Sequence, residues 1–225
     1  MEPGNARIYS SVVIIKAEHA SELLCAVYDS TYPLTAYRGR ANLLGGNRDA
    51  QDAGPEETLL RELREEFSGS APGQERSRHV EEILGEHRPP EPGAFANEED
   101  IDVLRETIIK RIKPYASFSC RVPSFPGGPR QPYTVTNSVF IAVIPRAVFE
   151  MARKNIIAGR GMLNEGHLFI AAFDELARGT ILTAHDSGVV LSASLGIELP
   201  NPEHVSCREL GKVAERYPDG DQRRP

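Results

Sequence analysis

The segment PEETLLRELREEF, residues 55–67, is the feature that most constrains the fold of this chain. Proline suits the first position of a helix because the N–H that it lacks has no partner there, and the two glutamates after it complement the positive end of the helix dipole. Leucines and the final phenylalanine recur at helical spacing. The segment therefore predicts an amphipathic helix whose apolar face packs on a core and whose other face is acidic.

Three carboxylates share that acidic face. Glu62 lies three residues before Glu65 and four before Glu66, a spacing that makes all three neighbours on a helix. A hard divalent cation such as Mg²⁺, which prefers oxygen ligands, would relieve the repulsion between them. On the carboxylates alone, a solvated helix face with surface ion pairs to Arg61 and Arg64 is the more common outcome, so both interpretations stay open.

The remaining segments alternate between strand and helix patterns. β-Branched and apolar runs predict strands, and apolar residues at helical spacing predict helices. The predicted strands are Tyr9–Lys16, Leu23–Tyr28, Ala41–Leu44, Tyr115–Val122, Val135–Ile144 and His167–Phe173, and the further predicted helices are Glu98–Ile112, Arg146–Lys154 and Leu182–Leu195. This order predicts an α/β fold, an α/β/α sandwich built on a mixed, largely antiparallel sheet.

The length of 225 residues suits one domain with a sizeable core. We expect a single domain over residues 1–200, with an irregular insertion rich in Gly and Pro at 68–97. Residues 201–225 form a polar tail that we expect to fray. Pro114 is expected to end the helix that precedes it.

Charge and composition limit the partners of the chain. A formal net charge of -6 gives no general attraction to DNA, RNA or an anionic membrane. No apolar run is long enough to span a bilayer, and the N-terminal residues lack the pattern of a secretory signal. The three cysteines are far apart and show no C-x-x-C spacing, so we expect neither a disulfide framework nor a zinc site, and a reducing, cytoplasmic location.

The segment GGNRDAQDAGPEETLLRELREEFS, residues 45–68, resembles the Nudix box. The pattern of that box is G-x5-E-x7-R-E-U-x-E-E-x-G-U, where U is apolar, and its RELREE core is intact here. The strand HLFIAAF followed by a last helix is also similar to the order of elements in the family. The resemblance implies a Nudix-type sandwich and a Nudix-type pyrophosphohydrolase, which hydrolyses a phosphoanhydride in a nucleoside diphosphate linked to another moiety. It also implies Mg²⁺ or Mn²⁺ as cofactor, a small nucleotide as partner, and a homodimer as one assembly to test.

The resemblance also implies a role for each matching residue. Glu65 and Glu66 would be metal ligands, and Glu62 a metal ligand or the catalytic base. The backbone carbonyl of Gly46 would bind metal as well, and Arg61 would orient a glutamate. In this chemistry metal ions neutralise the charge that develops on the diphosphate and lower the pKa of a bound water, which attacks phosphorus.

Two positions depart from the family's pattern. Counted back from Arg61, the first glutamate of the box falls on Ala53, and the loop from Gly46 is one residue longer than the pattern; Asp52 is the carboxylate that could replace that glutamate. The closing glycine is replaced by Ser68. These departures leave an alternative open, namely a catalytically degenerate Nudix-like module that binds or senses a nucleotide without hydrolysing it.

Residues outside the box are further candidates. Glu165 directly precedes the strand HLFIAAF, and its side chain could turn toward the site as an additional catalytic carboxylate. Arg38 and Arg40 could bind substrate phosphates through charge-assisted hydrogen bonds, although surface arginines are equally expected there. His185, expected on the last helix, is predicted to be structural or exposed, and Cys120 to be a small buried hydrophobe.

Aromatic residues could stack on a nucleobase. Tyr37, Phe118 and Tyr133 lie in or near predicted strands, where aromatic side chains more often belong to the core. Substrate choice in the Nudix family depends on loops outside the box, and the insertion at 68–97 and the loop at 124–132 are the candidates here.

Overall fold

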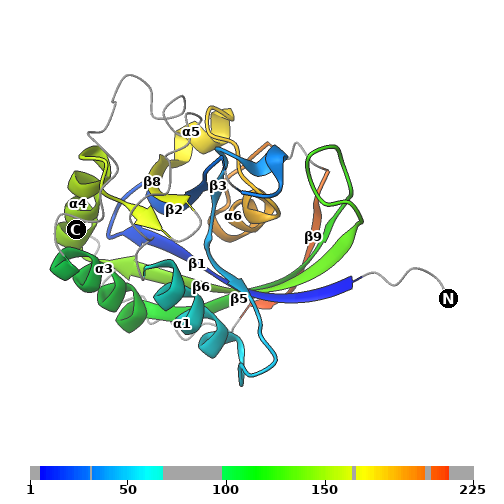
Figure 1. Cartoon of the computed structure of the whole chain (residues 1–225), viewed down its shortest axis with the longest axis horizontal. Coiled ribbons are helices and arrows are strands. Elements are labelled where there is room, and N and C mark those ends of the chain that lie inside the picture. Colours follow the sequence, from blue (N-terminus) through cyan, green and yellow to red (C-terminus); the bar gives the residue numbers. More distant parts are fainter. Residues whose placement is uncertain (1–5, 31, 68–97, 164–165, 201–203, 213–225) are drawn as a thin grey trace, which may run out of the picture.

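The computed structural model describes residues 6–30, 32–67, 98–163, 166–200 and 204–212. In these residues the centre of the fold is one mixed sheet of nine strands (Figure 1). Only β1 and β6 pair in parallel, and the other pairings are antiparallel. The main order across the sheet is β7 (Met162–Leu163), β8 (Gly166–Ala172), β2 (Glu22–Tyr28), β1 (Ala6–Ala17), β6 (Tyr133–Ile144), β5 (Ile112–Val122) and β9 (Ser206–Lys212), while β3 (Ala41–Asn42) pairs with β2 and β4 (Leu44–Asn47) with β1.

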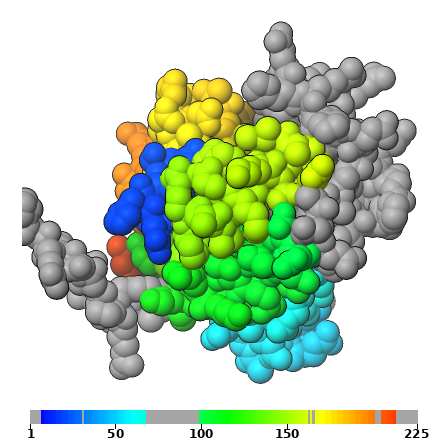
Figure 2. All heavy atoms as spheres, turned by 90° about the vertical axis from the view of Figure 1, so that its left-hand side faces the viewer, coloured from blue at the N-terminus to red at the C-terminus, as the bar shows by residue number. Residues whose placement is uncertain are grey.

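Helices cover both faces of the sheet. Alternate residues of a strand point to opposite faces, and on β1 Val13 and Ile15 belong to one apolar core whereas Ile14 belongs to the other. The predicted α/β/α sandwich is therefore confirmed. The first core packs under α1 (Pro55–Glu66), α3 (Glu98–Arg111) and α4 (Arg146–Ile157), and the second packs under α5 (Phe173–Arg178) and α6 (Ser187–Leu195), while a short 3-10 helix, η1, spans Thr35–Tyr37. Figure 2 shows α1, α3 and α4, coloured cyan, green and yellow-green, side by side on their face.

The helix predicted from PEETLLRELREEF is confirmed as α1. Gly54 precedes it in an extended conformation and Pro55 occupies its first turn, as expected for a residue that has no N–H to satisfy. Leu59, Leu63 and Phe67 are buried in the first core. This burial fixes the rotation of the helix about its own axis, so the acidic face is turned toward β4.

Two predicted boundaries are wrong. Pro114 does not end a helix, because α3 ends at Arg111 and β5 runs through Pro114, with a register shift between Pro114 and Ala116. A bulge of this kind accommodates a residue that cannot donate to the ladder. The last helix begins at Ser187 instead of Leu182, since His185 has a φ of 50°, a left-handed conformation that an α-helix excludes.

The expectation of a frayed tail is also wrong in part. Residues 206–212 form β9, an edge strand antiparallel to β5. Most of its side chains are exposed, so it lacks the apolar alternation by which strands are predicted. The expected end of the domain at residue 200 stays a prediction, although β9 lies beyond it and pairs with β5. The insertion at 68–97 lies outside the described residues.

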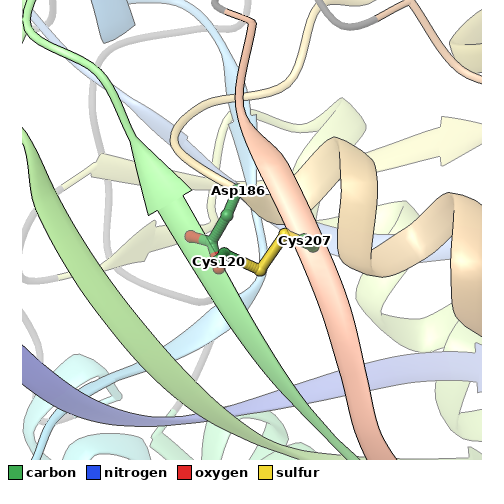
Figure 3. Close-up of side chains that lie close together, drawn as sticks. All are labelled: Cys120, Asp186 and Cys207. Atoms are coloured by element: carbon green, nitrogen blue, oxygen red, sulfur yellow. A yellow bond between two sulfur atoms is a disulfide. The ribbon is translucent and has the colours of Figure 1, made fainter.

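The expectation that the cysteines form no disulfide is wrong as well. Cys120 on β5 and Cys207 on β9 face each other across the ladder and are joined by a disulfide (Figure 3). Cys120 is fully buried as predicted, and Cys25 is a buried free thiol. Within the described residues no helix has both the length and the apolarity to cross a membrane.

The anchoring of α1 gives a testable prediction. Leu63 has no exposed surface, so we expect Leu63→Ala to lower the free energy of unfolding by about 2–5 kcal/mol through lost contacts and a cavity. Its exposed neighbour Arg64 provides the control, for which Arg64→Ala should stay within about 0.5 kcal/mol. Urea unfolding followed by circular dichroism measures both changes, and equal effects would contradict the packing of α1 described above.

Candidate functional site

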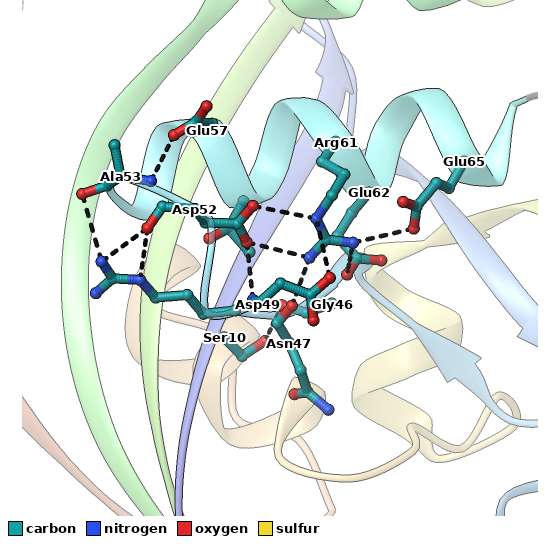
Figure 4. Close-up of polar contacts among 12 residues, drawn as sticks. Ser10, Gly46, Asn47, Asp49, Asp52, Ala53, Glu57, Arg61, Glu62 and Glu65 are labelled. Atoms are coloured by element: carbon teal, nitrogen blue, oxygen red, sulfur yellow. Dashed lines mark hydrogen bonds and ion pairs between the residues drawn. The ribbon is translucent and has the colours of Figure 1, made fainter.

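Arg61 connects the helix of the box to the loop before it (Figure 4). Its Nε and Nη2 each donate to one carboxylate oxygen of Asp52 at 3.2 Å, and Nη2 also donates to the carbonyl of Asn47 at 2.8 Å. Its Nη1 lies 2.9 Å from Oε1 of Glu62 and 3.0 Å from Oε2 of Glu65. One guanidinium therefore holds three carboxylates and a backbone carbonyl at hydrogen-bond distance, and the carboxylate of Asp49 lies 3.7 Å from its Nε. The bond to Asp52 is the main cause that raises the pKa of Arg61.

Asp52 is the acidic partner of Arg61 on the loop. Its side chain is almost completely buried, and it also accepts a hydrogen bond from the backbone N–H of Asp49 at 2.9 Å. The bonds from Arg61 lower the pKa of Asp52 to about 2. The neighbouring Ala53, on which the pattern count had placed a glutamate, takes part through its backbone alone: its N–H donates to Glu57, and its carbonyl accepts a hydrogen bond of 3.3 Å from Nη2 of Arg48.

Glycine at position 46 allows Glu62 to approach the backbone. A Cβ on Gly46 would lie 2.4 Å from the Cδ of Glu62, far inside van der Waals contact. The carbonyl of Gly46 accepts a hydrogen bond of 2.9 Å from the hydroxyl of Ser10. Gly45 has a φ of 131°, and a side chain there would collide with the carbonyl of Ser11. The two glycines of the box thus bring β4 against β1 and leave room for the Glu62 carboxylate.

These groups line one end of a cavity of about 340 Å³. Asp49, Glu62, Glu65 and Glu66 contribute carboxylates to it, together with the backbone of Gly46. Among the described residues that line the cavity there is no lysine or arginine. Arg61, which is not among the lining residues, pairs with Glu62 and Glu65. Four carboxylates against this one guanidinium leave the box end of the cavity with a net negative charge.

The donor atoms at the box end suit a hard divalent cation. Carboxylate and carbonyl oxygens are the ligands that Mg²⁺ and Mn²⁺ take. The carboxylate of Glu65 is half exposed and is engaged by Arg61. To bind a metal ion, Glu65 would have to give up its bond to Arg61. Across the part of the chain that is described, one group of three ligand-type side chains lies within 4.8 Å, namely Cys120, Asp186 and Cys207, and its sulfurs are joined in the disulfide (Figure 3).

The inner end of the same cavity is aromatic and uncharged where His185 lies. Both ring nitrogens of His185 are hydrogen-bonded, Nε2 to the hydroxyl of Tyr32 at 3.0 Å and Nδ1 to that of Tyr133 at 3.2 Å. The ring of Tyr37 packs against it with centroids 3.9 Å apart. Burial lowers the pKa of His185 to about 4, so the imidazole is neutral at physiological pH.

Asp186 and Asn137 lie beside His185 at the inner end. The Nδ2 of Asn137 donates a hydrogen bond to Oδ2 of Asp186, and both residues line the cavity. Burial raises the pKa of Asp186. The Cys120–Cys207 disulfide lies behind this carboxyl group (Figure 3).

Arg38 and Arg40 are not among the residues that line the cavity. The Nε of Arg38 donates to the carbonyl of Tyr32 at 2.8 Å, and Arg40 is half-buried, so that desolvation lowers its pKa. Their role in phosphate binding stays a prediction. Glu165 lies outside the described residues, as does Ser68.

Sequence reasoning missed the inner end of the cavity. Tyr133 was named as a residue that could stack on a base or belong to the core, and His185 was predicted to be structural or exposed; both line the cavity. Asn137 and Asp186 were not singled out at all. A signal existed for Asp186, because it directly precedes Ser187 at the start of α6, a position where acidic residues are frequent. No sequence spacing links it to Asn137, which lies on β6.

No protein-family model and no curated protein matches this chain. Among the solved structures to which it is similar at low identity are the following three. NrtR of Shewanella oneidensis shares 12% identity over 83% of this chain and 61% of its own, with a TM-score of 0.44. RenU, a Nudix hydrolase of M. smegmatis, shares 14% over 86% and 88%, with a TM-score of 0.39. A Nudix hydrolase of Alicyclobacillus acidocaldarius shares 14% over 87% and 93%, with a TM-score of 0.42.

The last two of these proteins are hydrolases of the Nudix family, the family that the box resembles. The chain spans less than two thirds of the length of NrtR. The function of this chain is inferred from the residues of its own site.

The low pKa of Asp52 predicts a pH dependence of stability. Because the folded pKa of about 2 lies below the ordinary value of 3.8, the ion pair with Arg61 stabilises the fold fully above about pH 4 and loses this effect as the pH falls toward 2. Thermal unfolding of wild type and Asp52→Asn between about pH 6 and pH 2 should show a difference in Tm that narrows with acid. The exposed Asp102→Asn is the control, and a difference that is constant over this range would contradict the ion pair.

Proposed function

We propose that this chain is a Nudix-type pyrophosphohydrolase that hydrolyses a phosphoanhydride in a nucleoside diphosphate linked to another moiety. The proposed cofactor is Mg²⁺ or Mn²⁺, held by Glu62, Glu65, Glu66 and the carbonyl of Gly46. The observation that carries this proposal is the Arg61 network, which joins loop and helix of the box and gathers their carboxylates at one end of a cavity. A merely solvated helix face would need neither the buried Asp52 nor the close approach of Glu62 to Gly46.

The charge of the cavity supports a requirement for metal. Phosphate oxygens would meet the carboxylates of Asp49, Glu62, Glu65 and Glu66. Arg61 pairs with several of these carboxylates, but its single positive charge does not balance them. Like charges in a partly desolvated site repel strongly. A diphosphate therefore needs divalent cations in order to bind there.

Each residue of the network has a proposed task. Arg61 fixes the carboxylate of Glu62 at 2.9 Å, which positions Glu62 as a metal ligand or as the base that accepts a proton from the attacking water. Asp52 holds Arg61 in place from the loop. When bound, the metal supplies charge neutralisation at the diphosphate and a more acidic water. The part of Glu165 as an additional carboxylate stays a prediction, as do a homodimer and a cytoplasmic location.

A second candidate function is a module that binds or senses a nucleotide without hydrolysing it. It is favoured by one observation, namely that Arg61 engages both Glu62 and Glu65. If the binding energy of metal and substrate does not release Glu65 from Arg61, the ligand set stays incomplete.

A turnover experiment distinguishes the two functions. We expect phosphate or mononucleotide release from nucleoside triphosphates, dinucleotides or nucleotide sugars in Mg²⁺ or Mn²⁺, and none in chelator. Glu65→Gln should lower kcat by more than about tenfold, the loss typical of disturbing groups around a catalytic metal. Glu56→Gln, on the first turn of the same helix, is the matched control and should retain activity. Silence of the wild type over the whole panel would favour the binding module, and metal-independent turnover would contradict both.

Metal binding also predicts a thermal shift that does not depend on turnover. A ligand that binds only the folded state stabilises it by about 2.7 kcal/mol when present at about one hundred times its Kd. We therefore expect Mg²⁺ or Mn²⁺ to raise the Tm of the wild type and of Glu56→Gln, but to raise that of Glu65→Gln much less. An equal shift in all three proteins would place the ion elsewhere on the surface.

A further inference from the structure

The carboxyl group of Asp186 lies beside the Cys120–Cys207 disulfide and takes no part in the helix that follows it. Asp186 directly precedes α6, a position from which an aspartate normally accepts a hydrogen bond from the first turn of the helix. Its side chain makes no such bond. It lies next to the two sulfurs, and Nδ2 of Asn137 donates to its Oδ2 (Figure 3).

Three atoms that commonly bind metal ions meet at this point. The sulfurs of Cys120 and Cys207 and a carboxylate oxygen of Asp186 all lie within 4.8 Å of one another. Zn²⁺ binds thiolates at about 2.3 Å and carboxylate oxygens at about 2.0–2.2 Å in tetrahedral sites, which places its ligand atoms roughly 3–4 Å from one another. Once the bond between the sulfurs is open, small shifts are therefore enough for the three atoms to share one ion.

The ladder between β5 and β9 keeps the two cysteines paired when that bond is open. On either side of them, Ser119 pairs with Arg208 and Arg121 pairs with Ser206. Side chains that lie opposite each other in an antiparallel ladder stay adjacent. The two thiols are thus held together by the backbone and not only by their own bond.

β9 has little else to anchor it. Cys207 is the one residue of this strand that is not exposed, so the strand contributes little apolar burial at the edge of the sheet. Reduction of the disulfide leaves β9 attached through its backbone hydrogen bonds to β5. A metal ion shared by Cys120, Cys207 and Asp186 would again cross-link β9, β5 and the start of α6, and metal binding of this kind stabilises the folded state.

We propose that reduction converts the disulfide into a zinc site, in which the thiolates of Cys120 and Cys207 and the carboxylate of Asp186 bind one Zn²⁺. A dithiol supplies the two electrons: the bond between the sulfurs breaks, two thiols form, and the dithiol closes to its own disulfide. Zn²⁺ then displaces both thiol protons into solvent as the Zn–S bonds form. A water molecule from the cavity, which Asp186 lines, completes the four ligands.

This site differs in chemistry from the box end of the cavity. Its ligands include two soft thiolates, whereas the box end offers only oxygen atoms, which suit harder cations. The three ligands come from β5, β9 and the residue before α6, so no C-x-x-C spacing marks the site in the sequence. The zinc site does not depend on the proposed hydrolysis.

Co²⁺ binding to the reduced protein tests the site without substrate. The protein is reduced with a dithiol, separated from it in the absence of oxygen, shown by thiol titration to carry all three thiols, and titrated with Co²⁺ in excess Mg²⁺. Cobalt bound to thiolates gives an intense near-ultraviolet charge-transfer band, which cobalt bound to carboxylates alone lacks. We expect this band in the reduced wild type, its loss when Zn²⁺ is added, and no band in the oxidised protein.

Three variants assign the ligands. Cys207→Ser and Asp186→Ala should each weaken Co²⁺ binding at least about tenfold, with circular dichroism to confirm that they fold. Cys25→Ser removes a buried thiol outside the group and is the matched control, which should keep the band and the affinity of the wild type.

Four results would overturn the proposal. They are fully titrated thiols without the band, a band that survives Cys207→Ser at wild-type affinity, an affinity that Asp186→Ala leaves unchanged, and a disulfide that a dithiol does not reduce in the folded protein.

Discussion

The guanidinium of Arg61 is the interaction on which the site depends. The segment from β4 to α1 has no regular structure of its own between residues 48 and 54, so its position must come from side chains. Arg61 reaches back nine residues to Asp52 and fourteen to the carbonyl of Asn47, and Arg48 adds a hydrogen bond of 2.9 Å to the carbonyl of Asp52. The buried face of α1 fixes the position of the Arg61 backbone, and the Arg61 side chain in turn holds the carboxylates of the box. The packing of the core and the geometry of these carboxylates are therefore coupled through one side chain.

The helix of the box was predictable because several features of its sequence indicate the same structure. Its apolar positions at 59, 63 and 67 all face one core, so periodicity, the proline at the start and the acidic face are consistent with one another. The pattern of β-branched residues likewise predicted β1, β2, β5 and β6, whose two faces pack on two helical layers. Asp52 was considered as a replacement for the missing glutamate because it is adjacent in sequence, and that replacement stays a prediction. Only the structure shows that Arg61 bonds to its carboxylate.

The parts that were not predictable are those that tertiary contacts determine. The inner end of the cavity combines Tyr28 from β2, Asn137 from β6 and Asp186 before α6, and no local spacing in the sequence brings these three together. His185 interrupts an apolar run that looks helical, because its backbone is left-handed; the hydroxyls of Tyr32 and Tyr133 hold its ring. β9 was not predicted, because an exposed edge strand needs few apolar residues. The pairing of Cys120 with Cys207 was not predicted for the same reason, since Cys207 lies on β9.

The Cys120–Cys207 disulfide bears both on the compartment in which the protein works and on the inner end of the cavity. Cys120 and Cys207 are 87 residues apart in sequence, and closing a loop of about that length removes roughly 4–5 kcal/mol of chain entropy from the unfolded state. Such bonds persist in oxidising compartments and are reduced in a cytosol, which opposes the cytoplasmic location expected from cysteine spacing.

With the bond closed, β9 is covalently tied to β5 directly behind Asp186. With the bond reduced, β9 is held to β5 by backbone hydrogen bonds at an exposed edge, and two thiols lie beside the carboxyl group. We therefore expect the rigidity of that end of the cavity to depend on redox state. The Arg61 network at the box end contains no sulfur, so we expect it to be unaffected.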